Sequence, residues 1–255
     1  MIFDSHAHYD DEAFEEDRDL LLSSMQANGI DTIVNVGASI ESSGSSLQLA
    51  ETYDFVYAAV GVHPSDTDEL NEENYLELCK LMDKEKVVAV GEIGLDYYWD
   101  TPSRDIQKKW FVRQLNTAVE KNKPVIIHSR DAAADTLDIM KAEKPWDQGG
   151  VIHCFSYSVE MAREYLNHGF YIGIGGVLTF HNAKKLKEVA EYVPLNQIVL
   201  ETDCPYLAPV PNRGKRNSSL NLTYVADMLA EIKGIAREEI ERVTYENACR
   251  LYRIK

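Results

Sequence analysis

The sequence predicts a (β/α)8 TIM barrel, in which residues 1–255 form a single metal-dependent hydrolase domain. Three observations lead to this fold class. Eight short runs of apolar, often β-branched residues resemble buried strands, segments with helical spacing separate them, and five of the runs end in residues that can bind a divalent metal. Apolar runs with polar ends are typical of parallel barrel strands, whose active sites gather at their C-terminal ends.

The strand-like runs follow one another along the chain with helical segments between them. In chain order we expect strands at residues 3–8, 32–36, 55–63, 87–92, 125–128, 151–153, 171–175 and 199–203.

Amphipathic helical spacing fills the intervals between these strands. It predicts helices over 14–28, 41–52, 71–84, 103–122, 131–143, 158–168, 182–193, 219–233 and 236–251. Asn71 and Ser103 are expected helix starts. An open doubly wound sheet also alternates strands and helices, but no glycine-rich phosphate motif follows the first strand. The barrel is favoured because it brings the ends of distant strands around one axis.

Composition limits the function classes. A 255-residue chain that is 45% hydrophobic can bury a large core. We expect a cytoplasmic protein, because the N-terminus carries no signal-peptide pattern and the four cysteines have no paired short spacing. No run reaches membrane-spanning length, and no obligate protein partner is indicated. The net charge of −16 argues against broad adhesion to nucleic acid or membrane, although bound dications can reverse the local field.

The polar strand ends supply six candidate metal ligands. Side chains alternate faces along a strand, so the candidates in each strand continue its barrel-facing row. They are His6, His8, Glu92, His128, His153 and Asp203. Six ligands exceed the needs of one tetrahedral ion, so two ions sharing a bridging Glu92 are predicted. The nitrogen-rich set favours Zn or Mn over Mg.

Two acidic residues lie one step deeper on the same faces. Asp4 and Glu201 either accept the second ring N–H of a metal-binding histidine or support the barrel floor through hydrogen bonds. Cys154 and Cys204 have the opposite parity and are expected to face the helical layer as packing residues, with metal ligation as the lesser alternative.

Other residues at the strand ends suit substrate contact. His63, before Pro64, is interpreted as a substrate-facing or a turn-stabilising residue. The cationic loop with Arg213, Lys215 and Arg216 is either a phosphate-binding loop or an ordinary solvated turn. Aromatic residues after the fourth strand, at 97–99, suit base stacking or an apolar lid.

Taken together, the motifs resemble the TatD-type metal-dependent deoxyribonucleases, a branch of the amidohydrolase-like metal barrels. The resemblance spans nearly the whole chain and rests on segments 4–8, 61–64, 91–97, 128–132, 153–156 and 201–209. It implies that His6, His8, Glu92 and Asp203 enclose one ion, and that Glu92, His128 and His153 enclose the other.

The expected function is hydrolysis of phosphodiester bonds in DNA through a metal-bridged hydroxide. Asp203 and Glu92 are the expected catalytic residues, with Asp203 also accepting the proton of the attacking water. Phosphate contacts are assigned to His63, Arg130 and the loop cations Arg213, Lys215 and Arg216. By resemblance, cleavage is exonucleolytic from the 3′ end. The alternatives are an amide, lactone or ester hydrolase, such as an aminoacyl-tRNA deacylase, and a non-catalytic metal-binding scaffold.

Overall fold

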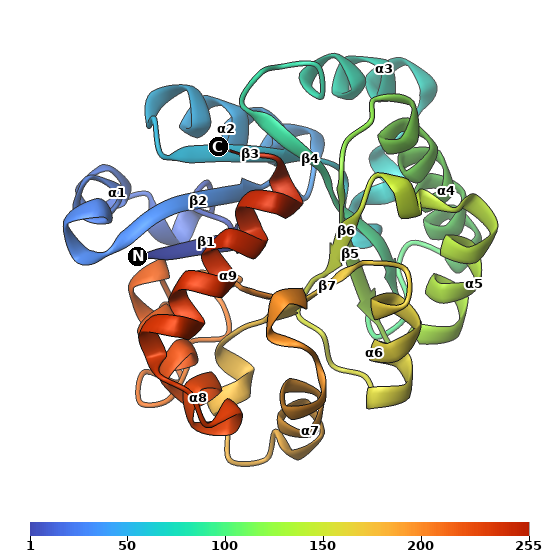
Figure 1. Cartoon of the computed structure of the whole chain (residues 1–255). Helices are drawn as coiled ribbons and strands as arrows, with labels where there is room; N and C mark the ends of the chain where they lie inside the picture. Colours follow the sequence, from blue (N-terminus) through green and yellow to red (C-terminus); the bar gives the residue numbers. More distant parts are fainter. Residues whose placement is uncertain (255) are drawn as a thin grey trace. The chain divides into compact units, whose positions relative to one another are not determined.

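The computed structural model describes residues 1–254 and has the TIM-barrel fold class that the sequence predicts (Figure 1). The eight strands follow sequence order from β1 to β8. The pairs β1–β2, β3–β4, β4–β5, β5–β6 and β7–β8 are parallel. A doubly wound sheet would reverse its strand order at a switch point, so that alternative is wrong.

Backbone contacts divide the chain into two compact units, which are described in turn. The first, called the terminal unit below, consists of Met1–Asn35 and the chain from Cys154 onward; the second, the central unit, is Val36–His153. The expectation of a single domain stays a prediction.

The terminal unit contains four strands. Their bounds are β1 Ile2–Ala7, β2 Ile30–Val36, β7 Tyr171–Ile174 and β8 Ile198–Leu200, with Val36 already counted in the central unit. Its helices are α1 Arg18–Ser24, α6 Val159–Leu166, α7 Lys184–Tyr192, α8 Leu222–Lys233 and α9 Arg237–Tyr252. Helix α9 packs against β1 and β8 (Figure 1), where buried Tyr252 donates a hydrogen bond to the carbonyl of Ser5 at 2.8 Å.

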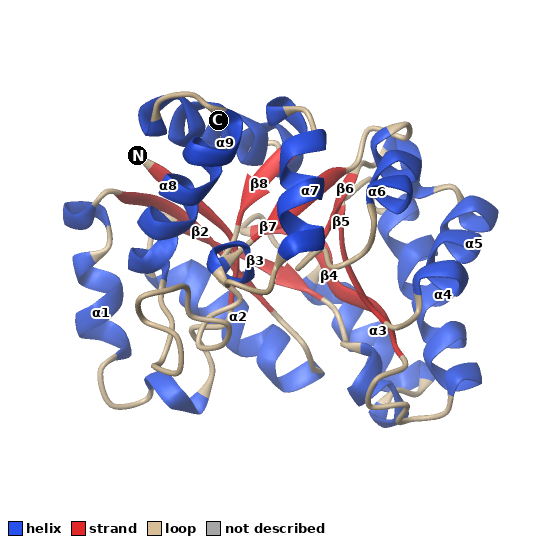
Figure 2. Cartoon of the chain, turned by 90° about the horizontal axis from the view of Figure 1, so that it is seen from below, coloured by secondary structure: helices blue, strands red, loops and turns tan. Residues whose placement is uncertain are grey.

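The central unit contains the remaining strands and helices. Its strands are β3 Val56–Val60, β4 Val87–Asp96, β5 Val125–Arg130 and β6 Gly150–Ile152. Its helices are α2 Ile40–Thr52, α3 Glu72–Leu81, α4 Arg104–Glu120 and α5 Ala133–Glu143. Helices α4 and α5 cover β4 and β5 (Figure 2). The expected helix starts are confirmed, since Asn71 and Ser103 occupy the N-cap positions of α3 and α4.

Strand ends differ from the predicted bounds at the functionally important positions. β4 extends to Asp96, whereas β8 ends at Leu200 and β6 at Ile152. His153 and Asp203 therefore lie just beyond strands. The residue after His153, Cys154, has φ +45°, and Asp203 has φ +56°. Strand alternation does not extend through such left-handed residues, so backbone geometry sets the directions of these side chains.

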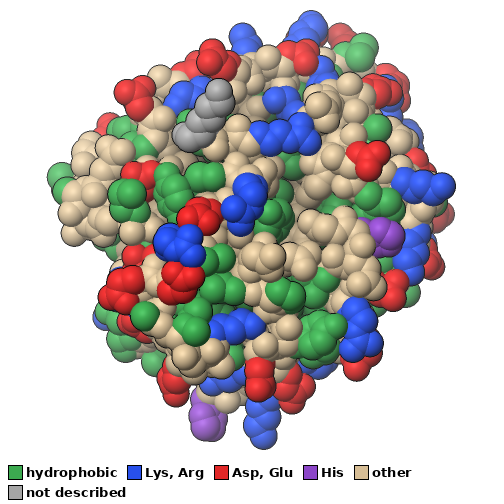
Figure 3. Space-filling model, in the orientation of Figure 1, with side chains coloured by type: hydrophobic (Ala, Val, Ile, Leu, Met, Phe, Trp, Pro, Cys, Tyr) green, Lys and Arg blue, Asp and Glu red, His purple; other side chains and the backbone are tan. Residues whose placement is uncertain are grey.

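Surface features agree with the composition. On the face drawn in Figure 3, Lys and Arg side chains are interleaved with Asp and Glu, and the described residues form no broad basic area there. None of the helices within residues 1–254 is both long and apolar enough to cross a membrane.

Candidate metal centre

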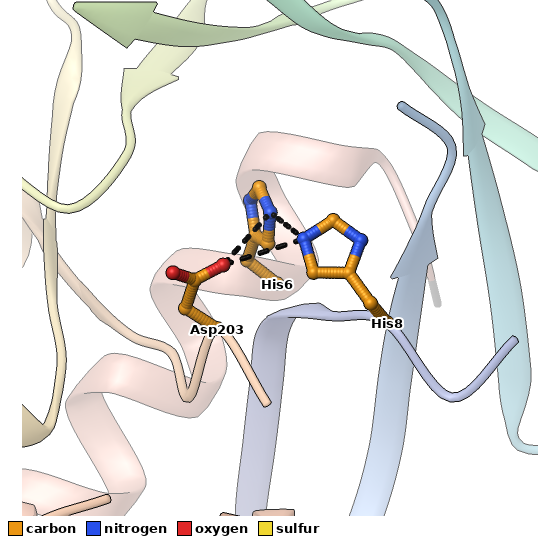
Figure 4. Close-up of side chains that lie close together, drawn as sticks. All are labelled: His6, His8 and Asp203. Atoms are coloured by element: carbon orange, nitrogen blue, oxygen red, sulfur yellow. Dashed lines mark hydrogen bonds and ion pairs between the residues drawn. The ribbon is translucent and has the colours of Figure 1, made fainter. Parts of the chain in front are cut away.

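Two imidazoles and a carboxylate lie close together in the terminal unit (Figure 4). His6 Nε2 lies 3.0 Å from His8 Nε2, and Asp203 Oδ1 lies 3.3 Å from His8 Nε2 and 3.8 Å from His6 Nε2. The backbone creates this arrangement. Asp203 N donates to His6 O, and His8 N donates to Cys204 O, each at 2.9 Å. The chain beyond β8 is thus paired with the end of β1, which brings the three side chains together.

The geometry of this cluster fits a divalent ion. Two imidazole nitrogens 3.0 Å apart need a proton or a cation between them, because their lone pairs repel each other. Tetrahedral ligands at about 2.1 Å from a zinc ion lie roughly 3.4 Å from one another. The three observed separations, 3.0, 3.3 and 3.8 Å, bracket that value. We name this group the His6 cluster: His6, His8 and Asp203.

Asp4 braces the loop that carries Asp203. Its Oδ1 accepts from Thr202 N at 3.0 Å and His6 N at 3.3 Å, and its Oδ2 accepts from the hydroxyls of Thr202 and Ser219 at 2.6 Å each. Burial raises the pKa of Asp4 to about 7, although these hydrogen bonds partly oppose the shift. All four of these hydrogen bonds come from backbone N–H groups or hydroxyls. They therefore support the barrel floor, which is one of the two roles expected for Asp4.

Glu201 braces a second loop of the terminal unit. Its Oε1 accepts from Cys154 N at 2.6 Å, which ties the segment after β6 to the end of β8. Gly173 leaves room for this carboxylate, because a Cβ there would lie 2.3 Å from Glu201 Oε2. Cys154 lines a cavity together with Asp203, and its backbone has φ +45°. Its expected orientation toward the helical layer stays a prediction. Cys204 is fully buried, as expected for a packing residue.

A second cluster lies in the central unit and is centred on His128. His128 Nδ1 lies 2.7 Å from Glu92 Oε1, and His128 Nε2 lies 3.0 Å from Asp96 Oδ2. His153 Nε2 lies 3.7 Å from the same Glu92 oxygen. The parallel register pairs Gly94 with His128, and only glycine fits there because a Cβ would lie 1.8 Å from His128 O. We name Glu92, Asp96, His128 and His153 the His128 cluster.

Burial and hydrogen bonds shift the pKa values of two residues in the His128 cluster. Desolvation opposes protonation of His128, but the hydrogen bonds with Asp96 and Glu92 outweigh it and raise its pKa. Desolvation also opposes ionisation of Asp96, yet hydrogen bonds from His128 and the Trp99 backbone lower its pKa. In many metal sites one nitrogen of a histidine binds the metal and the other bonds a carboxylate. His128 has this orientation, with one nitrogen facing Glu92 and the other bonded to Asp96.

His63 belongs beside this cluster and also stabilises a turn. Its Nδ1 accepts from Ser65 N at 3.2 Å at the start of the 3-10 helix Pro64–Glu69. Its ring centroid lies 4.3 Å from that of His128, and one atom from each of His63, Glu92 and His128 falls within 4.8 Å of the others. The turn-stabilising interpretation is therefore confirmed. His63 also lies next to the candidate ligands Glu92 and His128, and its role in substrate binding stays a prediction.

The predicted phosphate-binding cations differ in their surroundings. Arg216 forms a bidentate ion pair with Asp17, with N–O distances of 2.7 and 2.6 Å, so its charge is locally neutralised. The Arg213 guanidinium lies 4.3 Å from the ring centroid of Phe180, and Lys215 is exposed. Arg130 lies 3.8 Å from the ring centroid of exposed Tyr98.

Sequence reasoning gave no role to Asp96, although it has the same parity as Glu92 on an extended β4. Its Oδ1 accepts from Tyr98 N and Trp99 N at 2.9 and 3.0 Å, so one carboxylate connects His128 to the aromatic loop. Gln107 in turn exchanges hydrogen bonds with the backbone of Asp96. A signal was available in the spacing of 92, 94 and 96 along one strand face.

Comparisons with known proteins agree with this geometry. Residues 3–253 match the family model described as TatD related DNase. An uncharacterized metal-dependent hydrolase of Bacillus subtilis, YabD, is 45% identical over 100% of both chains. A protein of Cronobacter sakazakii named 3'-5' ssDNA/RNA exonuclease TatD is 33% identical, covering 98% of this chain and 97% of that protein.

A solved structure extends the agreement to the fold. The crystal structure of YJJV, a TatD homologue from Escherichia coli K12, superposes with a TM-score of 0.93 at 30% identity, covering 100% of this chain and 98% of that one. Sequence match, fold and the two ligand clusters lead to one conclusion: the chain belongs to the family of TatD-related DNases, a family of metal-dependent hydrolases.

Proposed function

We propose that this protein is a deoxyribonuclease that hydrolyses phosphodiester bonds in DNA from the 3′ end. The observation that carries the proposal is the His6 cluster, in which a partly exposed carboxylate faces two imidazoles at ligand distances. Family membership and the exonuclease name of the Cronobacter relative support phosphodiester substrates. A structural zinc site would not need a carboxylate that opens onto a cavity.

Each cluster is proposed to hold one divalent ion, which is Zn, Mn or Mg. His6, His8 and Asp203 would hold the first, and Glu92, His128 and His153 the second. Bound ions would supply a water of lowered pKa and would offset the charge of the phosphate oxygens. That Glu92 serves both ions remains a prediction from the sequence.

Asp203 is proposed to accept the proton of the attacking water. Its Oδ1 is directed at the two imidazoles, whereas its other oxygen points away from them (Figure 4). The side chain is 19% exposed, so water can reach it. The bonds from Thr202 and Ser219 to Asp4 fix the adjacent backbone and therefore the position of this carboxylate. A fixed base near the water lowers the barrier more than a mobile one.

Phosphates remote from the cleaved bond are proposed to contact cations in each unit. Arg130 serves in the central unit, and Arg213 and Lys215 serve in the terminal unit, where they lie outside the Arg216–Asp17 pair. His63, next to His128, is proposed to contact a phosphate or to protonate the leaving group.

The test is an assay of metal-loaded protein on DNA labelled at the 3′ or the 5′ end, single- and double-stranded, with a lactone and an ester tested beside it. Stepwise release of 3′ mononucleotides is the expected result. Hydrolysis of the lactone or the ester without cleavage of DNA would overturn the proposal in favour of the alternative hydrolase.

A further inference from the structure

A cavity of about 200 Å³ opens in the terminal unit directly beside the His6 cluster. It is enclosed by the segments after β6, β7 and β8 and by the start of α7. Its wall combines apolar side chains, glycine backbone and a few polar groups.

Part of the cavity wall belongs to the candidate metal centre. Asp203, which faces His6 and His8, lines the cavity, as does Glu201. A group held in the cavity therefore lies next to the carboxylate that we propose as the proton acceptor.

The walls suit a flat apolar group. Phe155, Val177, Leu186 and Leu207 supply apolar surface. Gly176 lets two loops meet, since a Cβ there would lie 2.1 Å from Leu207 O. Pockets for drug-sized ligands occupy about 300–1,000 Å³, so a smaller cavity holds one ring system rather than several.

The cavity wall also includes a cation and an amide. Lys185, in the first turn of α7, and Asn182, just before that helix, line the cavity and are exposed. The chain has a net charge of −16, so a lysine beside the cavity is a local exception. Lys185 would attract an anionic group of a ligand, while the apolar cavity would hold its ring.

We infer that this cavity binds the single unpaired nucleobase of the nucleotide that is being removed, with Lys185 on a neighbouring phosphate. The inference rests on the proposed function and adds a substrate position to it. Asn182 provides hydrogen bonds to the base edge. Because apolar surface dominates the remaining wall, binding depends on the presence of a base more than on its identity. Only a base separated from its partner strand enters a cavity of this size.

The experiment compares oligonucleotides that end in a 3′ thymidine with oligonucleotides that end in a 3′ abasic residue. Wild-type protein is expected to favour the thymidine end by roughly tenfold to hundredfold in kcat/KM, the range for loss of one base contact. Ala183→Trp, which fills the cavity, should bring this ratio close to one. A thermal unfolding measurement verifies that the variant folds.

Two adjacent lysines provide a matched pair that does not depend on cavity filling. Lys184 and Lys185 are both exposed in α7, but only Lys185 lines the cavity. Lys185→Ala should raise KM and reduce the slope of log affinity against log salt by about 0.7, the value for one phosphate of a single strand. Lys184→Ala should leave both unchanged. Of the two lysine variants, only Lys185→Ala should bind thymidine 5′-monophosphate more weakly in equilibrium dialysis.

The outcomes separate this inference from the proposed function. Cleavage of DNA with equal rates on thymidine and abasic ends, or equal effects of the two lysine variants, would overturn the base-binding cavity and leave the nuclease proposal standing. Absence of cleavage on every DNA would overturn the nuclease proposal, while the dialysis experiment would still decide whether the cavity binds a nucleotide.

Discussion

The His6 cluster and the His128 cluster contain the same ligand chemistry but differ in how it is held. In the His128 cluster the carboxylates of Glu92 and Asp96 are 5% and 2% exposed, and both bond one imidazole. In the His6 cluster the carboxylate of Asp203 is 19% exposed, lies beyond a strand and borders a cavity.

This difference indicates a division of labour. The imidazole of His128 is held through Nε2 by Asp96, so its orientation does not depend on substrate, and its other nitrogen, beside Glu92, is suited to ligate an ion at a constant position. A partly exposed carboxylate beside a cavity is suited to meet water and substrate. Buried residues of β4 thus position the carboxylates of the His128 cluster, and the left-handed backbone at Asp203 positions the carboxylate of the His6 cluster.

Removing the buried carboxylate should have the largest effect. We expect Glu92→Gln to reduce turnover below detection, because the amide oxygen is a poorer ligand and His128 loses a charged partner. Metal analysis should show loss of both ions if Glu92 bridges them. Loss of only one ion would show that Glu92 serves the His128 cluster alone. Glu85→Gln, an exposed site before β4, makes the same charge change as a control.

Asp203→Asn should separate chemistry from metal binding in the His6 cluster. We expect a loss of turnover of about 10²–10⁴-fold, typical of removal of a general base, while His6 and His8 retain much of the metal affinity. Kinetics at saturating metal, with metal content measured in parallel, test this. If excess metal restored full activity, Asp203 would be a ligand only and the proposed division would fail.

Asp96→Asn should test whether orientation of His128 matters. The amide keeps one oxygen for the N–H groups of Tyr98 and Trp99, but it presents an NH₂ group where a carboxylate bonded His128. We expect about a 10–100-fold loss of metal affinity or activity, the range for partners that orient metal ligands. Asp138→Asn on the exposed face of α5 is the matched control. Unaltered metal affinity and activity would assign Asp96 to loop structure alone.

Asp17→Asn should have the smallest effect, and it should increase DNA affinity where the other variants reduce activity. Hydrogen bonds from Arg216 lower the pKa of Asp17, so the pair is intact at neutral pH and is lost only as pH falls through that lowered value. Removing the carboxylate exposes the Arg216 charge beside the proposed phosphate-binding loop. DNA affinity at low salt should rise modestly, with a salt slope steeper by about 0.7–0.9. Addition of Arg216→Ala should cancel the gain; a gain that persisted would exclude Arg216 as its source.

Several parts of the molecule could be read from local patterns. Continuous apolar runs such as 87–90 and 125–127 become strands of the barrel because burial removes their side chains from water, and helical spacing predicts the segments between them. Strand parity predicts that His6 and His8 share one face, and they do meet, with Nε2 atoms 3.0 Å apart. The predicted strand end at Glu92 falls short of Asp96 because Gly94, a poor strand former, interrupts the pattern.

The sequence by itself determined the fold class and the types of residue that form the two clusters, since side-chain periodicity and ligand chemistry are local properties. Only the tertiary structure decided which polar side chains pair with which, through hydrogen bonds or ion pairs between distant parts of the sequence. Asp4 was found to brace Thr202 and Ser219, Asp96 to orient His128, and Arg216 to pair with Asp17 across 199 positions of the chain. The cavity likewise follows from loops that are distant in sequence. Such contacts depend on where separate segments meet, which no short stretch of sequence encodes.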